Sequence, residues 1–198
     1  MKKAFKFFAI ALLAGTVMIS CNKDEEENGG NNETPGDPIL LETNFDNGMP
    51  DTYTILDNDG DGDTWECKGL NMGVDESDCA TSCSYINNFG PLEPDNYMIT
   101  PAITIPNGKY SISWQVRAQD PDYPSEVYDV YVGTLENGTF TSLGTLHHET
   151  IESDAWKTRT IDLSAYAGKT VSFAFRHHDV TDMYWMHIDN IKVFDNTL

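Results

Sequence analysis

The chain alternates between apolar and polar positions over most of its length. Short runs of this kind recur from residue 39 onward and are separated by polar turns, which is typical of β-strands with one buried face. The pairs Asn107-Gly108 and Asn137-Gly138 are favoured in tight hairpin turns. The runs cover residues 39–45, 53–56, 97–105, 110–118, 127–134, 140–146, 156–163, 170–177 and 184–194. They predict an all-β fold, an antiparallel β-sandwich, with only residues 164–168 forming a helical turn.

The run at 184–194 differs from the others because its alternation changes phase. Before Asp189-Asn190 the apolar residues Met186 and Ile188 stand at even positions. After this pair the apolar residues Ile191 and Val193 stand at odd positions. A change of phase of this kind predicts a β-bulge. A bulge that turns Asp189 and Asn190 to one side is a candidate ion site, and a simple register change is the alternative.

The N-terminal segment has the order of a secretion signal. Three lysines precede an apolar run at residues 7–19 that is too short to span a bilayer comfortably. Met18-Ile19-Ser20-Cys21 resembles the lipobox of bacterial lipoproteins, in which the cysteine is lipidated after cleavage. We therefore expect a lipoprotein signal peptide at 1–20 and lipidation of Cys21, with an ordinary signal peptide as the alternative.

The segment at 21–38 predicts a flexible tether. After Cys21 it consists largely of charged, glycine and asparagine residues and contains hardly any apolar side chain. It therefore cannot bury enough apolar surface to order itself. Its first residues also resemble the acidic export tag of surface-displayed lipoproteins. We expect the folded domain at 39–198 to be lipid-anchored at the outer membrane and exposed on the cell surface.

Acidic residues dominate the charge of the chain. The formal net charge is −20 and the sequence pI is about 4.3. A surface this negative is repelled by nucleic acid and by anionic lipid. We expect no nucleic-acid partner, contact with the membrane only through the lipid anchor, and bound cations that offset part of the charge.

One loop concentrates this charge. Carboxylates stand at every second position, at Asp57, Asp59, Asp61 and Asp63, with glycines between them. Calcium accepts six to eight oxygen ligands in loose geometry, so alternating carboxylates in a tight turn suit it. The loop opens like an EF-hand, but the twelfth position is Lys68 and no flanking helix is predicted. We interpret it as a calcium-binding turn between strands, the alternative being a hydrated turn without an ion.

Candidate catalytic residues do not form a recognised motif. Cys67, Cys79 and Cys83 leave room for one disulfide in any of three pairings, and none has a companion histidine motif. His147-His148 and His177-His178 are adjacent pairs, whose members face opposite sides of a strand and cannot jointly chelate an ion. We expect these histidines to be surface or half-buried positions and the protein not to be an enzyme.

Aromatic side chains are the candidate ligand contacts. Trp114 lies on the apolar face of its run and is expected in the core. Trp65 and Trp185 neighbour the predicted ion loops, so we expect them to be platforms for stacking on a sugar.

Several stretches resemble the cleaved-adhesin domains of bacterial haemagglutinins and gingipains. The resemblance spans about residues 40–194 in the family's order. The stretches are Asn44-Phe45-Asp46-Asn47-Gly48-Met49-Pro50, residues 56–62, Ser84-Tyr85-Ile86-Asn87, Pro94-Asp95-Asn96-Tyr97, Ala118-Gln119-Asp120, Tyr123-Pro124, residues 175–178, Thr181-Asp182-Met183 and Ile188-Asp189-Asn190.

The resemblance implies a galactose-binding-like jelly-roll sandwich with structural calcium, expected as two ions. It implies that the first ion is held by Asp57, Asp59, Asp61 and Asp63 with help from Asn96. A second would join Asn44 and Asp46, after the first strand, to Asp189 and Asn190 in the last strand. The family often has Ser, Glu and an acid where this chain has Asn44, Asp46 and Asn190, which lowers the charge of the second site.

The resemblance also implies a function in binding. Cleaved-adhesin domains occur in surface adhesins, so the expected partner is a host or extracellular protein or glycan. Two alternatives remain at this point: a carbohydrate-binding module of a glycan-uptake system, and a structural surface protein that binds neither. No protease domain is present in these residues, so the proteolysis of gingipains is not carried over.

Overall fold

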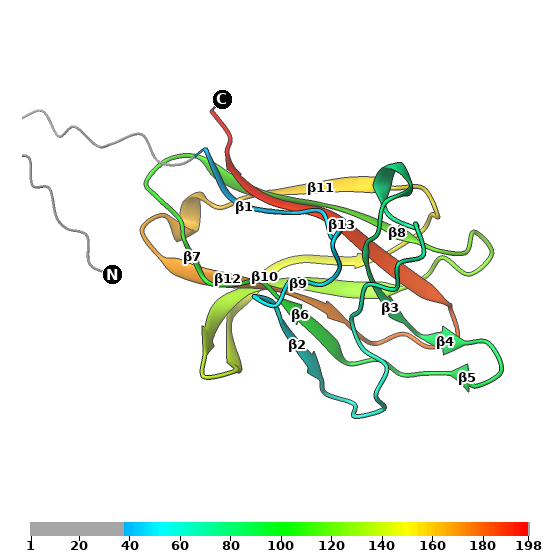
Figure 1. Ribbon diagram of the computed structural model, residues 1–198. Helices are drawn as coiled ribbons and strands as arrows, with labels where there is room; N and C mark the ends of the chain where they lie inside the picture. The colour runs from blue at the N-terminus through cyan, green and yellow to red at the C-terminus, as the bar shows by residue number, and fades with distance from the viewer. Residues whose placement is uncertain (1–37, 198) are drawn as a thin grey trace, which may run out of the picture. The chain divides into compact units, whose positions relative to one another are not determined.

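A computed structural model describes residues 38–197, which lie in one compact unit at 35–198. Two antiparallel sheets face each other in it (Figure 1). The predicted signal peptide at 1–20, the lipidated Cys21 and residues 22–37 of the predicted tether lie outside the described residues. Within residues 38–197, no helix is long and apolar enough to cross a membrane.

The first sheet is built around the last strand of the chain. The order is β1 (Ile39–Thr43), β13 (Trp185–Asp195), β8 (Tyr110–Ala118) and β11 (Lys157–Asp162), and β3 (Ala80–Cys83) also pairs with β13. One edge of β13 pairs with β8. Its other edge is shared, because β3 pairs with residues 185–188 and β1 with residues 191–194.

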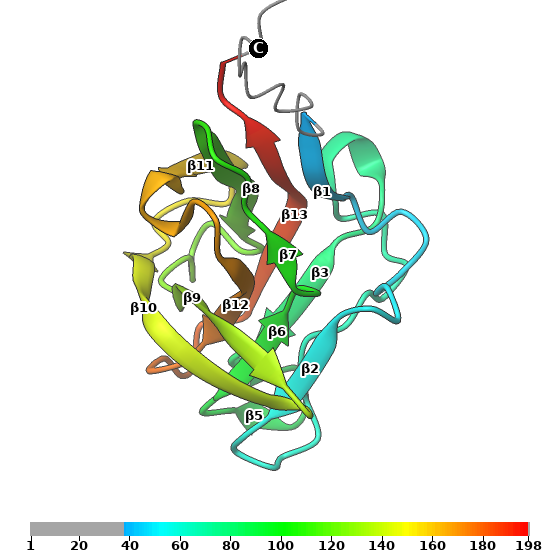
Figure 2. The same ribbon diagram turned by 90° about the vertical axis from the view of Figure 1, so that its left-hand side faces the viewer.

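The second sheet has six strands (Figure 2). The order is β10 (Thr139–Thr150), β9 (Val127–Glu136), β12 (Thr170–His177), β6 (Asn96–Ile99) and β2 (Thr54–Asp57), with β7 (Ile103–Thr104) pairing with β12. A separate pair is formed by β4 (Tyr85–Ile86) and β5 (Gly90–Pro91), and two short 3₁₀ turns are η1 (Val74–Glu76) and η2 (Ser164–Tyr166).

The predicted all-β jelly-roll class is confirmed, and each expected run contains a strand. The run at 97–105 is divided into β6 and β7 around Pro101, which has no N–H for a ladder hydrogen bond. The expected turn at 164–168 contains η2, and the expected bulge is present where the pairing of β13 with β8 shifts between Asp189 and Lys192. The alternation pattern missed β3, β4 and β5, which are at most four residues long.

The core fills the space between the two sheets. From the first sheet, Trp114 and Val193 are fully buried, and from the second, Met98, Phe173 and Phe175 are fully buried. The ring of Trp114 meets that of Phe175 edge to face, with centroids 5.6 Å apart. Contacts of this kind between sheets add to the free energy of burial.

A half-buried carboxylate joins the two sheets at one side of this core. Glu149 of β10 accepts two hydrogen bonds from Arg159 of β11, one from Arg159 Nε at 2.8 Å, and another from the Tyr128 hydroxyl at 2.9 Å. Tyr128 in turn accepts a hydrogen bond from Trp114 Nε1. Burial raises the pKa of Glu149, but the hydrogen bonds from Arg159, His147 and Tyr128 outweigh it and lower the pKa to about 2.

Glu149→Gln should lower the free energy of unfolding by about 1 to 2 kcal/mol at pH 7, because a charge-assisted contact becomes neutral. The native pKa is depressed, so this stability is present above the ordinary pKa of 4.5 and is lost as the pH falls toward about 2. Urea unfolding of wild type and variant across this range is the measurement. The exposed neighbour Glu152→Gln is the control, and a difference between Glu149→Gln and wild type that stays constant down to pH 2 contradicts the assignment.

Candidate functional site

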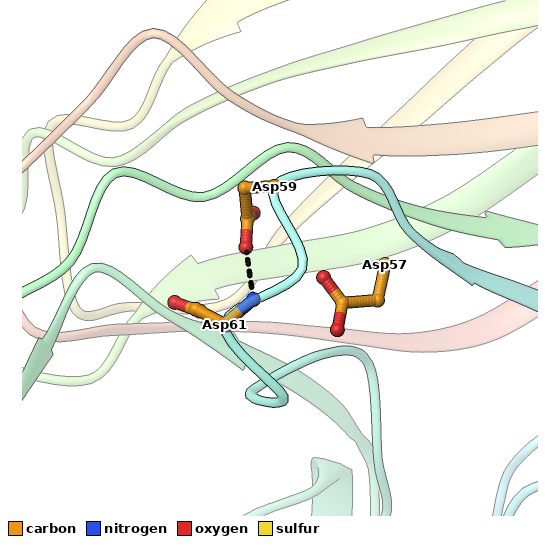
Figure 3. A group of neighbouring side chains, drawn as sticks. All are labelled: Asp57, Asp59 and Asp61. Atoms are coloured by element: carbon orange, nitrogen blue, oxygen red, sulfur yellow. Dashed lines mark hydrogen bonds between the residues drawn. The ribbon is translucent and has the colours of Figure 1, made fainter.

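The acidic loop after β2 brings three carboxylates together. One oxygen each of Asp57, Asp59 and Asp61 lie within 4.8 Å of one another, and all three residues are exposed (Figure 3). Gly60 and Gly62 have φ angles of 75° and 90°, a region that strains other residues, so the glycines allow this tight path. Among the described residues, no other three acidic, histidine or cysteine side chains converge in this way.

Backbone amides hold these carboxylates in place. Asp57 accepts hydrogen bonds from the N–H groups of Gly60 at 2.7 Å and Gly62 at 3.0 Å. Asp59 accepts one from Asp61 at 3.1 Å, drawn in Figure 3, and one from Asp95 at 2.5 Å. Each carboxylate keeps further lone pairs for a ligand. The loop therefore holds one oxygen of each carboxylate close to an oxygen of the other two.

Burial raises the pKa of Asp61, and the neighbouring charges of Asp59 and Asp63 raise it further, while the hydrogen bond from the Asp63 N–H opposes this. No cationic side chain is paired with Asp57, Asp59 or Asp61 among the described residues. Unbalanced repulsion of this kind is what a bound cation would relieve.

Asn96 links the loop to the interior. It begins β6 directly opposite Asp57, and it is 1% exposed. Its Nδ2 donates to the carbonyl oxygen of Asp63 at 3.0 Å and more weakly to Ser82 Oγ at 3.4 Å. Its Oδ1 is buried and has no hydrogen-bond partner in the described chain. A buried oxygen without a partner costs about 1 to 3 kcal/mol unless a ligand satisfies it.

The second predicted site lies at a break in the first sheet. The pairing of β3 with β13 ends at Ile188, and that of β1 begins at Ile191, so Asp189 and Asn190 face neither strand on this edge. The residues that follow β1 and those that precede β3 therefore meet at this break. Sequence reasoning placed Asn44 and Asp46 there but missed Asp78. Asp78 is positioned by β3, a strand too short to show an alternating pattern in the sequence.

Asp189 is a buried acid without a cationic partner among residues 38–197. It is 1% exposed and accepts hydrogen bonds from the N–H groups of Val74 at 2.8 Å and Asn190 at 2.7 Å. Burial raises its pKa, the two hydrogen bonds oppose this, and the charges of Asp46 and Asp78 raise it further, to about 6. The arrangement favours a proton or a metal cation at this position.

The other members of the second set are exposed or engaged elsewhere. Asn44 Nδ2 donates to Asp46 Oδ2 at 2.6 Å in the exposed turn after β1. Asn190 has a φ of 49° at the bulge, and its Nδ2 donates to Gln115 Oε1 of β8 at 2.7 Å. The structure thus brings Asp46 and Asp189 into electrostatic contact and directs the Asn190 amide toward β8.

His177 and His178 are buried, which corrects the prediction that they are surface or half-buried positions. His177 is 0% exposed, with Nδ1 2.8 Å from Ser82 Oγ and Nε2 2.9 Å from Glu126 Oε2. His178 is 5% exposed and lies between Asp129, at 3.1 Å, and Asp179, at 2.9 Å. His177 continues the inward-facing series of Phe173 and Phe175, so alternation is consistent with its burial. The burial of His178 depends on contact with another strand, where it lies against Asp129 of β9.

The chain Ser82, His177 and Glu126 has the residue types of a hydrolase triad. The nitrogens are used in the opposite sense, since Nδ1 rather than Nε2 faces the serine. All three residues are at most 1% exposed, so a substrate does not reach Ser82 Oγ in this structure. The geometry supports a structural role, in which two sheets are joined by buried hydrogen bonds.

The three cysteines within the described residues are free. None of the three possible disulfide pairings is therefore formed in this structure. Burial raises the pKa of Cys67, Cys79 and Cys83 to about 12, with nearby acids such as Asp78, Asp189 or Asp63 adding to the effect. Thiols with such a pKa are poor nucleophiles at neutral pH.

Trp65 is a core residue, and its predicted role as a stacking platform is wrong. It is 2% exposed, and its Nε1 donates to the Asn96 carbonyl oxygen at 3.0 Å. Trp185 is half-buried, and the ammonium of Lys68 lies 3.9 Å from its ring centroid. After the acidic loop the chain turns Trp65 into the core, and the position of Trp65 beside the loop in the sequence did not indicate this.

Comparison with known proteins places this geometry in context. The Cleaved Adhesin Domain family matches residues 39–193. Hemagglutinin A of Porphyromonas gingivalis is 33% identical over 195 residues, which cover 88% of this chain and 9% of that protein. Gingipain R1 of the same species is 35% identical over 174 residues, which cover 79% of this chain and 10% of that protein. The chain thus matches about a tenth of the length of these relatives.

Solved structures agree with the sequence comparison. A cleaved adhesin domain of Lys-gingipain from Porphyromonas gingivalis has a TM-score of 0.68 at 34% identity, covering 79% of this chain and 98% of that one. The CBM22-1 xylan-binding domain from Paenibacillus barcinonensis has a TM-score of 0.52 at 14% identity, covering 79% and 93%. The second likeness concerns the fold alone. The chain belongs to the Cleaved Adhesin Domain family.

Proposed function

We propose that the protein is a calcium-stabilised adhesin module that binds extracellular macromolecules, proteins or glycans, at the bacterial cell surface. The observation that carries the binding function is family membership over residues 39–193, together with adhesin relatives at 33 to 35% identity. The buried Ser82, His177 and Glu126 chain and the protonated thiols support binding rather than catalysis.

The donor set of the acidic loop fits calcium. Asp57, Asp59 and Asp61 supply carboxylate oxygens, and calcium prefers oxygen ligands. Asp63 lies at the end of the loop, and Asn96 Oδ1 provides a buried acceptor without a partner. Calcium bound there would neutralise the loop and hold it against β6.

The second proposed ion lies at the break beside β13. Asp189 and Asp46 interact electrostatically there, and Asp78 belongs to the same acidic group. Calcium would stabilise Asp189 in its charged form and tie the turn after β1, with Asn44, to the bulge at Asn190. The free energy of ion binding would offset part of the entropy cost of closing the long loop between these segments.

The proposed location is the outer membrane surface, with lipidated Cys21 as anchor. The adhesin relatives support a place at the cell surface. The acidic composition supports separation of the domain from anionic lipid, so that only the anchor contacts the membrane.

Calcium should raise the melting temperature, and Asp61→Asn should reduce this gain. At a tenfold excess over Kd, one site contributes about 1.4 kcal/mol, or roughly 3 to 6 °C for a domain of this size. Differential scanning calorimetry with calcium and with excess chelator is the measurement. The exposed Asp154→Asn variant should behave as wild type. An equal melting temperature of the wild type in both buffers contradicts calcium stabilisation.

Asp46→Asn tests the second ion separately. It removes one charge from an exposed turn, so the melting temperature in chelator should hardly change. The gain in melting temperature with calcium should fall by the contribution of one site, roughly 3 to 6 °C. Asp51→Asn changes an exposed acid nearby in the chain and serves as the matched control. Asp46→Asn with a full calcium response argues for a single ion in the acidic loop.

The binding function is tested with immobilised extracellular-matrix proteins, red cells and a glycan array. We expect saturable binding to at least one of these surfaces when calcium is present. Competition by excess unlabelled domain checks that binding is specific. A folded, calcium-loaded domain that binds none of them supports the structural-protein alternative.

A further inference from the structure

The outer face of the second sheet has unusually small residues at its centre. Gly133 of β9 and Ser172 and Ala174 of β12 lie on the side of the sheet that faces away from the core, because the neighbouring Val132, Phe173 and Phe175 point inward. Gly133, Ser172 and Ala174 are nevertheless buried. Larger side chains from the neighbouring strands must therefore cover them.

Aromatic rings provide this cover. A Cβ atom on Gly133 would lie 2.5 Å from Phe140 Cζ, so the Phe140 ring lies directly over the backbone of β9. Tyr131 is paired with Ala174, and Tyr97 with Arg176, in the strands on either side of β12. The two tyrosine rings are nearly parallel, at 23°, with centroids 6.5 Å apart.

Polar side chains position these rings. The Arg176 guanidinium lies 5.2 Å from the centroid of the Tyr97 ring and donates to Asp95 Oδ1 at 2.6 Å. The Tyr131 hydroxyl donates to Asp129 Oδ2 at 2.5 Å, and His148 Nδ1 lies 2.6 Å from the other oxygen of Asp129. The rings are fixed in orientation before any ligand arrives.

Two hollows lie on either side of Arg176. One of about 300 Å³ is lined by Leu56, Asn58, Tyr97, Tyr131, Phe140 and Ser142. The other, of about 440 Å³, is lined by residues that include Asp95, Arg176, His178 and Asp179. Arg176 lines the second hollow, and its guanidinium lies over the ring of Tyr97 in the first, so the two hollows are neighbours; we call the pair the sheet groove.

We propose that the sheet groove binds a neutral oligosaccharide chain, with Tyr97 and Tyr131 as stacking platforms. The apolar face of a pyranose ring packs on an aromatic ring, and its hydroxyls take hydrogen bonds from groups at the rim. Asn58, Ser142, Asp95 and Arg176 supply such donors and acceptors within the groove. Neighbouring hollows accommodate consecutive sugars.

Charge favours a neutral ligand over an anionic one. Glu93, Asp95 and Asp179 line the groove, and its one arginine is already paired with Asp95. An anionic polysaccharide would be repelled there and by the net charge of −20. A protein ligand is less suited, because the most exposed aromatic side chains, Phe89 at 88% and Tyr123 at 54%, do not line the groove.

This inference rests on the proposed binding function and names its ligand class. The test titrates the calcium-loaded domain with xylohexaose, cellohexaose and mannohexaose, and with hexagalacturonate as the anionic probe, by calorimetry and affinity electrophoresis. At least one neutral hexasaccharide should bind. Tyr97→Ala and Tyr131→Ala should each weaken it at least tenfold, whereas Tyr97→Phe keeps the ring and should bind within about threefold of wild type.

Two controls separate ring stacking from misfolding. Tyr123→Ala removes an exposed tyrosine outside the groove and should leave saccharide binding unchanged. Melting temperatures of all variants check that the domain is intact. If a folded Tyr97→Ala or Tyr131→Ala variant binds as wild type does, or if hexagalacturonate binds more tightly than every neutral probe, the inference is overturned.

The failure of the inference is distinguishable from that of the proposed function. If no neutral hexasaccharide binds, the groove assignment is wrong. Binding to matrix proteins or red cells in the same preparation would then still support the adhesin function, whereas binding to neither class would contradict both.

Discussion

A buried chain of hydrogen bonds connects the two sheets to the acidic loop. Glu126 accepts from Ser84 Oγ and from the N–H of Tyr184, and it contacts His177, which in turn contacts Ser82. Asn96 extends the chain from Ser82 to the Asp63 carbonyl. In a low-dielectric interior, a polar group that loses its partner costs more than the hydrogen bond contributes. The chain therefore resists separation of β3, β6 and β12, and it fixes where the loop leaves the sandwich.

Repulsion between acidic residues is distributed over two places where the sheets end. In the loop, glycines with positive φ let the carboxylates converge at the end of β2. At the break between β3 and β1, the buried Asp189 faces the charges of Asp46 and Asp78. Both arrangements raise the energy of the folded state when no cation is present. The proposed calcium ions would convert the same repulsion into a dependence of stability on the medium outside the cell.

The acidic loop and the sheet groove share residues, which relates stability to binding. Asn58 belongs to the loop and lines the groove, and its N–H donates to the Asp95 carbonyl. Asp95 also donates its N–H to Asp59 and holds Arg176 beside Tyr97. A disturbance of the loop would therefore reach the rim of the groove through two short contacts. The proposed ion would act on ligand affinity by ordering this rim, without touching the ligand.

Alternation along the chain was sufficient to identify the all-β class, every long strand and the bulge in β13, because each depends on which neighbouring residues face the core. The spacing of Asp57, Asp59 and Asp61 likewise indicated their convergence, since a tight turn brings such close neighbours together. Only the tertiary structure decided the burial of Trp65 and His178, the acid at Asp78 and the tyrosine surface on the second sheet. Tyr97 and Tyr131 are 34 residues apart in the sequence, and only the pairing of both β6 and β9 with β12 brings their rings together. Local pattern records which side of a strand a residue occupies, but contacts between distant segments determine what covers that side.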